Sequence, residues 1–373
     1  MAEPPTVYDV AERAGVSTAT VSRVMSDAQN VRGTTKQRVL DAVAELGYLQ
    51  SAAAKGLARN RSHILGLTFP DDLAQAEQSD ASFWYDELIR GAERAARQAG
   101  YMLLIAGSPS EDYQRVFTGV AGSCDGIVTM SGAHDPDTLA RVSARKPVVV
   151  IGSGSDRFDN VDHVLCANRD GAYELTAHLC DVHGVVQPGY VAGDAPDSHA
   201  RFTGFRAALR DRGLKVPRKP IAVGDLSTPG GRRVGEALVD NGLDVDALVC
   251  VNDQTAIGVI ESLVAAGIGV PGQLRVTGFD GVVFREPGAP LLTTSTQSMQ
   301  QMGALAAELL VERLNASRTT PVELSLDTTL RIGDTCGCDR AALVGPRMTG
   351  EPLPTRPEQG RATVLASTTN GGQ

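Results

Sequence analysis

The chain of 373 residues carries a net charge of −9 and is 42% hydrophobic. This length is typical of two or three globular units, and the hydrophobic share is sufficient for real cores, which excludes a globally disordered chain. Every apolar run falls short of the roughly 18 to 20 residues that cross a bilayer, and the N-terminal segment lacks the apolar region of a secretory signal. We therefore expect a cytoplasmic protein without a membrane partner.

Charge is unevenly distributed along the chain. Residues 1–61 hold eight Lys or Arg against six Asp or Glu, so the negative charge lies on the remainder. Because phosphates attract a basic segment and are repelled by an acidic one, this asymmetry favours nucleic-acid binding at the N-terminal end only.

Residues 1–50 are predicted to form three short helices. The first has apolar residues at helical spacing from Val7 to Ala14, and Gly15 follows where a C-terminal cap tolerates positive φ. Ser17 is a suitable N-cap for the second helix, which would bury one apolar face. The inward residues predicted for the second and third helices are Val21, Val24, Met25, Val39, Leu40, Val43 and Leu46.

The third helix is predicted to open with a capping box formed by Thr34 and Gln37 and to stop at Gly47. Two short helices joined by a tight turn that contains glycine, with a third helix in support, are typical of a helix-turn-helix domain. Residues 51–61 would then link this domain to the rest of the chain.

From residue 62 onward, short apolar runs alternate with amphipathic helical stretches, which predicts the α/β class with parallel sheets covered by helices. Roughly eight such units exceed one doubly wound sheet, so two similar lobes with a ligand cleft at their strand C-terminal ends are expected. We predict a first lobe over about 62–162 and 292–321 and a second over about 163–291 and 322–335. Residues 339–373 are rich in Pro, Gly, Thr and Ser, which predicts a disordered tail.

The segment TVYDVAERAGVSTATVSRVMSD, from Thr6 to Asp27, closely resembles the LacI/GalR family of bacterial transcription repressors. The similarity continues through VRGTTKQRVLDAVAELGY and then through ELIRGAERAARQAGY, CDGIV, ARFTGF, VNDQTAIG, VTGFD and LLTTSTQS, up to about residue 335. The resemblance implies a helix-turn-helix domain, a hinge over 51–61 and a two-lobed, periplasmic-binding-protein-like effector domain. We accordingly expect a repressor that binds a pseudo-palindromic double-stranded operator as a homodimer and is controlled by a small molecule, a sugar or sugar derivative.

The resemblance also implies which residues read DNA. Thr18, Ala19 and Arg23 match the base readers of the second helix; an arginine can fork onto guanine, and methyl groups can meet thymine. Short hydroxyls and other polar groups nearby suit phosphates, although helix capping and ordinary surface are the alternative for each. These further DNA-binding candidates are Tyr8, Ser17, Thr20, Ser22, Ser26, Arg32, Thr35 and Tyr48.

The hinge carries a distinct expectation. Residues 52–59 could form about two helical turns, which are too short to be stable alone in water. In the family this hinge folds on the operator, where a leucine wedges open a base step in the minor groove. Leu57 stands at that position with Lys55 and Ala58 beside it. The alternative is a flexible tether whose leucine packs on the body of the protein.

The effector site is implied by resemblance and by strand ends. Arg201 matches the arginine that grips effector oxygens across the family, and Asp280 ends a predicted strand, although a structural salt bridge between the lobes is the alternative for both. Trp84 is a candidate for stacking on a sugar, with packing at the lobe surface as the alternative. Where the family often has an aspartate, this chain has Gly152. The effector-binding candidates are Trp84, Ser153, Arg201, Leu226, Asn252, Asp280 and Gln297.

Neither a metal site nor a cofactor is expected. His178 and His183 have i, i+5 spacing, which departs from the helical face that metal ligands use, and Cys336-Gly337-Cys338 lacks partners at zinc-finger spacing. No Ser-His-Asp or Cys-His signature stands in a catalytic context, so we expect no enzyme. A solute-binding transport protein and a carbohydrate-acting enzyme are the alternatives, and the predicted DNA-binding head and the missing acid/base pair disfavour them.

Overall fold

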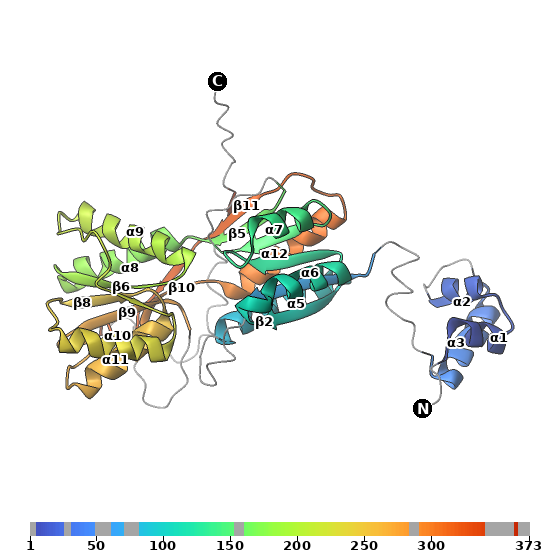
Figure 1. Ribbon diagram of the computed structural model, residues 1–373, viewed down its shortest axis with the longest axis horizontal. Helices are drawn as coiled ribbons and strands as arrows, with labels where there is room; N and C mark the ends of the chain where they lie inside the picture. The colour runs from blue at the N-terminus through green and yellow to red at the C-terminus, as the bar shows by residue number, and fades with distance from the viewer. Residues whose placement is uncertain are drawn as a thin grey trace, which may run out of the picture. The chain divides into compact units, whose positions relative to one another are not determined.

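The computed structural model describes residues 5–25, 31–48, 61–70, 82–152, 160–282, 291–339 and 362–364 (Figure 1). The chain divides into two compact units, Met1–His63 and Ile64–Gln373. Among the described residues, no helix combines the length and the apolar character needed to span a membrane.

The N-terminal unit contains the three predicted helices, α1 (Val7–Ala14), α2 (Thr18–Met25) and α3 (Gly33–Leu46). Each helix contributes one fully buried valine to a shared core, namely Val10, Val21 and Val39. The apolar periodicity of the first two helices is therefore confirmed, while Leu40 of α3 is 40% exposed and the prediction that it faces inward is wrong.

The caps of these helices follow the sequence only in part. Gly15 and Gly47 end α1 and α3 with φ of 63° and 64°, and the backbone N–H of Thr20 donates to Ser17 Oγ at 3.2 Å, as predicted. The capping box predicted at Thr34 is wrong, because the N-cap of α3 is Arg32, two residues earlier, and it makes no side-chain cap.

The first lobe of the larger unit is a sheet with strand order β13-β11-β5-β4-β3-β1-β2, parallel except for β13. Its strands are β1 (Ile64–Pro70), β2 (Met102–Ser108), β3 (Gly126–Met130), β4 (Val148–Ile151), β5 (Asp162–Cys166), β11 (Glu323–Leu326) and β13 (Ala362–Val364). Helices α5 (Ser82–Gln98) and α12 (Met299–Leu314) pack in one core cluster of this sheet, whereas α6 (Tyr113–Ser123) and α7 (Pro136–Ser143) pack in a second. A 3-10 turn, η2 (Ser110–Asp112), precedes α6.

The second lobe repeats this plan, with strand order β12-β10-β9-β8-β6-β7, parallel except for β12. Its strands are β6 (Pro188–Gly193), β7 (Ala222–Gly224), β8 (Ala247–Cys250), β9 (Arg275–Asp280), β10 (Thr293–Thr296) and β12 (Thr329–Arg331). Helices α8 (Asn168–His183) and α9 (Pro196–Asp211) lie on one face, and α10 (Thr228–Asp240) and α11 (Asp253–Ala265) lie on the other (Figure 1). The predicted pair of doubly wound lobes is confirmed.

The chain crosses between the lobes at positions that differ from the predicted boundaries. Strands β5 and β11 belong to the first sheet, although the prediction gave residues 163–166 and 322–326 to the second lobe. Strand β10 belongs to the second sheet, although residues 292–296 were predicted to lie in the first. Strands β5 and β11 mix polar with apolar residues and β10 holds only Thr and Ser, so their composition does not reveal which sheet they join.

The segment 339–373 also departs from the expectation of a tail without structure. Residues Ala362–Val364 form β13, which pairs antiparallel with β11 through Ser325 and Thr363. The remainder of that segment, apart from residue 339, lies outside the described residues.

Glycines set the spacing within the helix layers. A Cβ atom at Gly303 of α12 would fall on the carbonyl of Leu88 in α5, and one at Gly91 of α5 would fall on the carbonyl of Gln300 in α12. In the second lobe, Gly204 of α9 meets the carbonyl of Arg169 in α8 in the same way. These helices therefore touch backbone to backbone, and only glycine permits that approach.

Candidate nucleic-acid interface and ligand-binding site

Helix α2 has one buried and one outward face. Val21 and Val24 are buried against α1 and α3, and at 100° per residue Ala19 and Arg23 project from the opposite side. Both of these residues are exposed, and Ser22 beside them is half-buried. Two of the three predicted base readers, Ala19 and Arg23, thus stand on the exposed face of α2, whereas Thr18 is half-buried.

The other DNA-binding candidates differ in exposure, and some of them cap a helix or pack on the core of the domain. Tyr8 is 73% exposed, whereas Tyr48 is half-buried and packs on the core of the domain. Ser17 caps α2, and its Oγ lies 2.9 Å from Thr20 Oγ1, so the capping alternative holds for this pair. Arg32 is exposed, and Thr18 and Thr35 are half-buried. Candidates outside the described residues are Ser26, Lys55, Leu57 and Ala58.

Arg201, on α9, is the centre of a buried polar network in the second lobe. Its Nε donates to Asn168 Oδ1 at 2.7 Å, and its Nη1 donates to the carbonyl of Val251 at 2.6 Å. Its Nη2 lies 3.1 Å from Asp280 Oδ1, and the guanidinium carbon stands 3.9 Å above the ring of Phe279. Each of the three guanidinium nitrogens of Arg201 therefore has a partner, which fixes the orientation of the group.

Asp280 joins Arg201 to Gln297. The Gln297 Nε2 donates to Asp280 Oδ1 at 2.5 Å, so three of the predicted effector residues lie in one network. Burial and the charge of Asp197 raise the pKa of Asp280, and Arg201 offsets part of that rise. The salt bridge between Arg201 and Asp280, predicted as their alternative role, is present, but it joins α9 to β9 within the second lobe rather than linking the two lobes.

Two other candidates shape the site. Asn252 is the N-cap of α11: its Oδ1 accepts from the N–H of Thr255 at 3.0 Å, and its Nδ2 donates to Leu226 O and Gln254 Oε1. Leu226 is half-buried with a positive φ of 69°. These contacts hold the loop after β7 against the end of β8. Ser153 and the side chain of Trp84 lie outside the described part of the chain.

Sequence reasoning missed Asn168 and Asp197, which extend the network toward the first lobe. Asn168 Nδ2 donates to Asp197 Oδ1 at 2.9 Å, so this amide bridges Asp197 and Arg201. A Cβ atom at Gly152 in the first lobe would stand 3.8 Å from Asp197 Oδ2. Asn168 and Asp197 could have been found from their position, because both lie in the first turn of a helix that follows a strand, where the ligand-binding side chains of such sheets gather.

The first lobe has buried polar atoms near the carboxyl ends of its strands, the edge at which the Arg201 network lies in the second lobe. Among the described residues, Ser108 Oγ, Gln114 Oε1 and His134 Nδ1 are buried without a hydrogen-bond partner. Burial lowers the pKa of His134 to about 4, so its ring is neutral at pH 7. The Nε2 atom of the same ring lies 2.5 Å from Thr129 Oγ1. Buried polar atoms without partners are rare in folded proteins, and they occur where a ligand completes a site. The sequence analysis did not single out any of these three residues.

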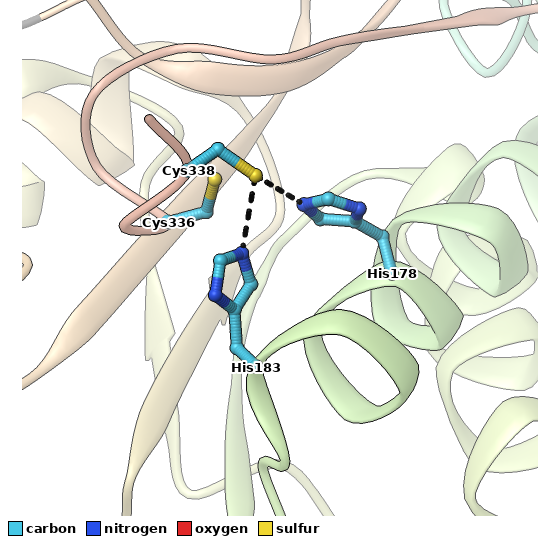
Figure 2. Close-up of side chains that lie close together, drawn as sticks. All are labelled: His178, His183, Cys336 and Cys338. Carbon is cyan, nitrogen blue, oxygen red and sulfur yellow. Dashed lines mark hydrogen bonds between the residues drawn. The ribbon is translucent and has the colours of Figure 1, made fainter. Parts of the chain in front are cut away.

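The expectation that Cys336-Gly337-Cys338 lacks partner ligands is corrected by the structure. The ring nitrogens of His178 and His183 and the thiols of Cys336 and Cys338 all lie within 4.8 Å of one another (Figure 2). The four residues come from α8 and from the chain after β12.

Family models match both units of the chain. Residues 6–51 match the model described as bacterial regulatory proteins, lacI family. Residues 73–331, more than half of the chain, match the model described as periplasmic binding proteins and sugar binding domain of LacI family.

Individual proteins agree with these matches. Catabolite control protein A of Priestia megaterium is 30% identical over 316 residues, which cover 83% of this chain and 92% of that protein. A complex of the transcriptional regulator CelR with cellobiose has a TM-score of 0.66 at 27% identity and covers 89% of this chain and 99% of that one. A lac repressor dimer bound to operator and the anti-inducer ONPF shares the fold with a TM-score of 0.76 at 24% identity, over 90% and 99% of the two chains.

Proposed function

The chain belongs to the LacI family of bacterial regulatory proteins, and from this premise we propose a repressor whose operator affinity is set by a sugar or sugar derivative. As a member of that family it is a DNA-binding transcriptional regulator. A regulator that binds chromosomal DNA works where the DNA is, so we assign it to the cytoplasm. We assign it no catalytic step, because the polar network around Arg201 contains no acid/base pair aimed at a common point.

The observation that carries the DNA-binding half is the uncovered face of α2. Ala19 and Arg23 project away from the buried Val21 and Val24, and a helix of this kind fits the major groove. Arg23 can donate two hydrogen bonds to the O6 and N7 of guanine, and Ala19 can contact a thymine methyl.

The polar network supports a polyol effector. A sugar hydroxyl both donates and accepts, and the network offers a carboxylate at Asp280, amides at Asn168 and Gln297 and the guanidinium of Arg201. The unpartnered polar atoms of the first lobe would complete the other side of the site. The related regulator CelR was solved with cellobiose, which favours the same class of ligand.

Asp197 compensates for the glycine at position 152. Family members often carry an aspartate there, and in this chain the carboxylate of Asp197 comes within 3.8 Å of the position that a Gly152 side chain would take. We propose that the acceptor for sugar hydroxyls comes from α9 of the second lobe. Because Gly152 belongs to the first lobe, a ligand held by Asp197 would contact both lobes and bias their closure.

A homodimer is supported by an exposed apolar edge. Strand β2 ends the first sheet and exposes Met102, Leu104 and Ile105 by 59%, 37% and 43% of their surface. An apolar edge strand of this kind favours association, and a two-fold dimer would match a pseudo-palindromic operator.

The DNA-binding proposal is tested with one variant and one matched control. Operator fragments selected from a random library are titrated with the wild type, Arg23→Met and Arg13→Met. Arg13 is an exposed arginine at the end of α1 in the same domain, where it pairs with Glu45 of α3. We expect Arg23→Met to weaken specific binding by roughly ten- to hundredfold beyond Arg13→Met, the discrimination of one bidentate base contact. Equal losses in the two variants would contradict the assignment.

The effector proposal is tested by thermal melting across sugars, sugar phosphates, polyols and nucleobases. A true effector at about 100 times its dissociation constant should add about 2.7 kcal/mol to the stability of the effector unit. Asp197→Asn should weaken that ligand, while Asp170→Asn, at an exposed aspartate in the first turn of α8, should leave it unchanged. A panel without any shift, or a shift that is identical in both variants, would refute the sugar site.

A further inference from the structure

A cluster of two histidines and two cysteines in the second lobe has the composition and spacing of a metal centre. The Nε2 atoms of His178 and His183 lie 3.6 Å and 3.3 Å from Cys338 Sγ, and all four candidate ligand atoms lie within 4.8 Å of one another (Figure 2). We propose that His178, His183, Cys336 and Cys338 bind one zinc ion. This site is separate from the DNA-binding face and from the Arg201 network.

The distances agree with a tetrahedral site. With Zn–S bonds of about 2.3 Å and Zn–N bonds of about 2.0 Å, tetrahedral geometry separates a sulfur from a nitrogen by about 3.5 Å. The two distances from Cys338 Sγ to the histidines, 3.6 Å and 3.3 Å, lie on either side of that value. The four groups therefore need only small side-chain rotations to enclose an ion.

The backbone that carries the cysteines is held independently of any metal. The N–H of Val276 donates to the carbonyl of Thr335 at 3.1 Å, and Arg275 Nε donates to the carbonyl of Cys336 at 3.1 Å. Gly337 has a φ of 93°, which lets the chain reverse so that both cysteines face α8. Strand β9 thus positions two thiols in advance, and such preorganisation favours ion binding.

The histidines are positioned by the end of α8. His183 is its last residue, Gly184 ends the helix with a φ of 66°, and the ring of His178 meets that of His183 edge to face at 5.1 Å. The chain that carries Cys338 approaches both rings (Figure 2), so the i, i+5 spacing does not prevent them from sharing one partner.

The ligand set selects the ion. Two thiolates with two imidazoles in tetrahedral arrangement suit zinc, whereas oxygen-preferring ions such as magnesium and calcium find no carboxylate in this cluster. Four protein ligands leave no open position, so the centre is structural rather than catalytic. Cys336 and Cys338 are free thiols in the structure, so a disulfide is the competing chemistry, and the test must separate the two.

The proposed centre would fasten the last part of the second lobe to its helix layer. Cys336 is fully buried in the core cluster that contains Leu175 and Leu179 of α8, and it lies more than 150 residues from that helix in sequence. A zinc ion closing so long a loop would stabilise the folded lobe, since its ligands are brought together only on folding.

The test uses the full-length protein, freed of any affinity tag and purified with reductant but without chelator. Elemental analysis should find about one zinc per chain, as expected for a closed four-ligand site. Cys338→Ser and His183→Asn should reduce the zinc content at least tenfold. Cys180→Ser, at a half-buried cysteine of α8 outside the cluster, should keep it. Far-UV circular dichroism verifies that each variant is folded.

Cobalt provides a second readout that does not depend on what the protein acquires during expression. Chelated, reduced wild type should take up Co²⁺ with the visible bands of tetrahedral cobalt and a thiolate charge-transfer band, and Cys338→Ser should lose both. A reduced wild type that binds neither ion, or variants whose metal content equals that of Cys180→Ser, would overturn the proposal. A Cys336–Cys338 disulfide in the freshly purified protein would overturn it as well.

Discussion

Arg201 and Asp280 are expected to depend on each other energetically. Their side chains are 7% and 9% exposed, so neither charge has water to replace its partner. Arg201→Met leaves Asp280 buried without its cation and removes the donors to Asn168 and Val251. Breaking a buried pair in this way costs about 3–5 kcal/mol in the free energy of unfolding.

The assay is a double-mutant cycle measured by urea unfolding of the full-length protein. Asp280→Asn removes the other charge but keeps the shape of the side chain. The double variant Arg201→Met/Asp280→Asn should be less destabilised than the sum of the two single variants by about 1–3 kcal/mol, because it leaves no unpaired charge. Gln297, which also contacts Asp280, remains in every variant.

A coupling energy below about 0.5 kcal/mol would refute the inference of a mutually dependent buried pair.

Three further outcomes are expected. Gly303→Ala should destabilise the first lobe by about 1–3 kcal/mol, because the added Cβ would meet the carbonyl of Leu88. Its control is Gly119→Ala in α6, where a Cβ would face open space and should not destabilise the lobe. Equal urea midpoints for the two variants would contradict the close packing of α5 and α12. Burial, and after it the negative charge of Asp280, raises the pKa of Asp253 from 3.8 to about 8 in the folded protein. Between pH 3.8 and about 8 the folded protein therefore keeps a proton that the unfolded chain has released. The free energy of unfolding should fall as the pH rises through this range. Urea titrations at several pH values should show this slope in the wild type and its loss in Asp253→Asn, and a slope that survives would contradict it. Leu57→Ala should weaken specific operator binding and spare nonspecific, salt-dependent binding in anisotropy at two salt concentrations, and equal losses in both modes would rule out the wedge.

Local chemistry was readable from the sequence where neighbours in the chain are neighbours in space. Val21 and Val24 were predicted as the inner face of α2 because helical geometry alone relates them, and Gly15 and Gly47 were predicted as caps because positive φ restricts the choice of residue. Thr34 was misread as a cap because a threonine followed three residues later by a glutamine matches a capping box, whereas α3 already begins at Gly33 after an N-cap, Arg32, that makes no side-chain cap.

The membership of strands in sheets was less readable. Strands β5 and β10 stand next to the crossings between lobes, and each is followed by a helix that packs in the other lobe, α8 after β5 and α12 after β10. Strand β5 joins the first sheet by pairing with β4, and β10 joins the second sheet by pairing with β9. Apolar periodicity carries no information on that pairing.

The Arg201 network was predicted in its main residues, whereas Asn168 and Asp197 were not. Arg201, Asp280 and Gln297 were found by resemblance and by their place at strand ends. Asn168 acts through two neighbours, and a bridging amide leaves no sequence signature beyond its own residue type. The unpartnered atoms at Ser108 and His134 are visible only once burial is known.

The histidine–cysteine cluster was not predicted from the sequence, because the i, i+4 spacing rule for metal ligands on a helix assumes that the ion lies beside the helix. His183 is the last residue of α8, so it can turn to a partner that approaches the helix end, where i, i+4 geometry no longer applies. The same helix begins at Asn168, the amide that links Arg201 to Asp197. Asn168 and His183 are fifteen residues apart, and at about 1.5 Å per residue they lie about 22 Å apart along the axis of one helix. Fixing the far end of α8 to the chain after β12 therefore also restrains Asn168, and the proposed zinc centre would stiffen the scaffold that aims Arg201 without contacting it.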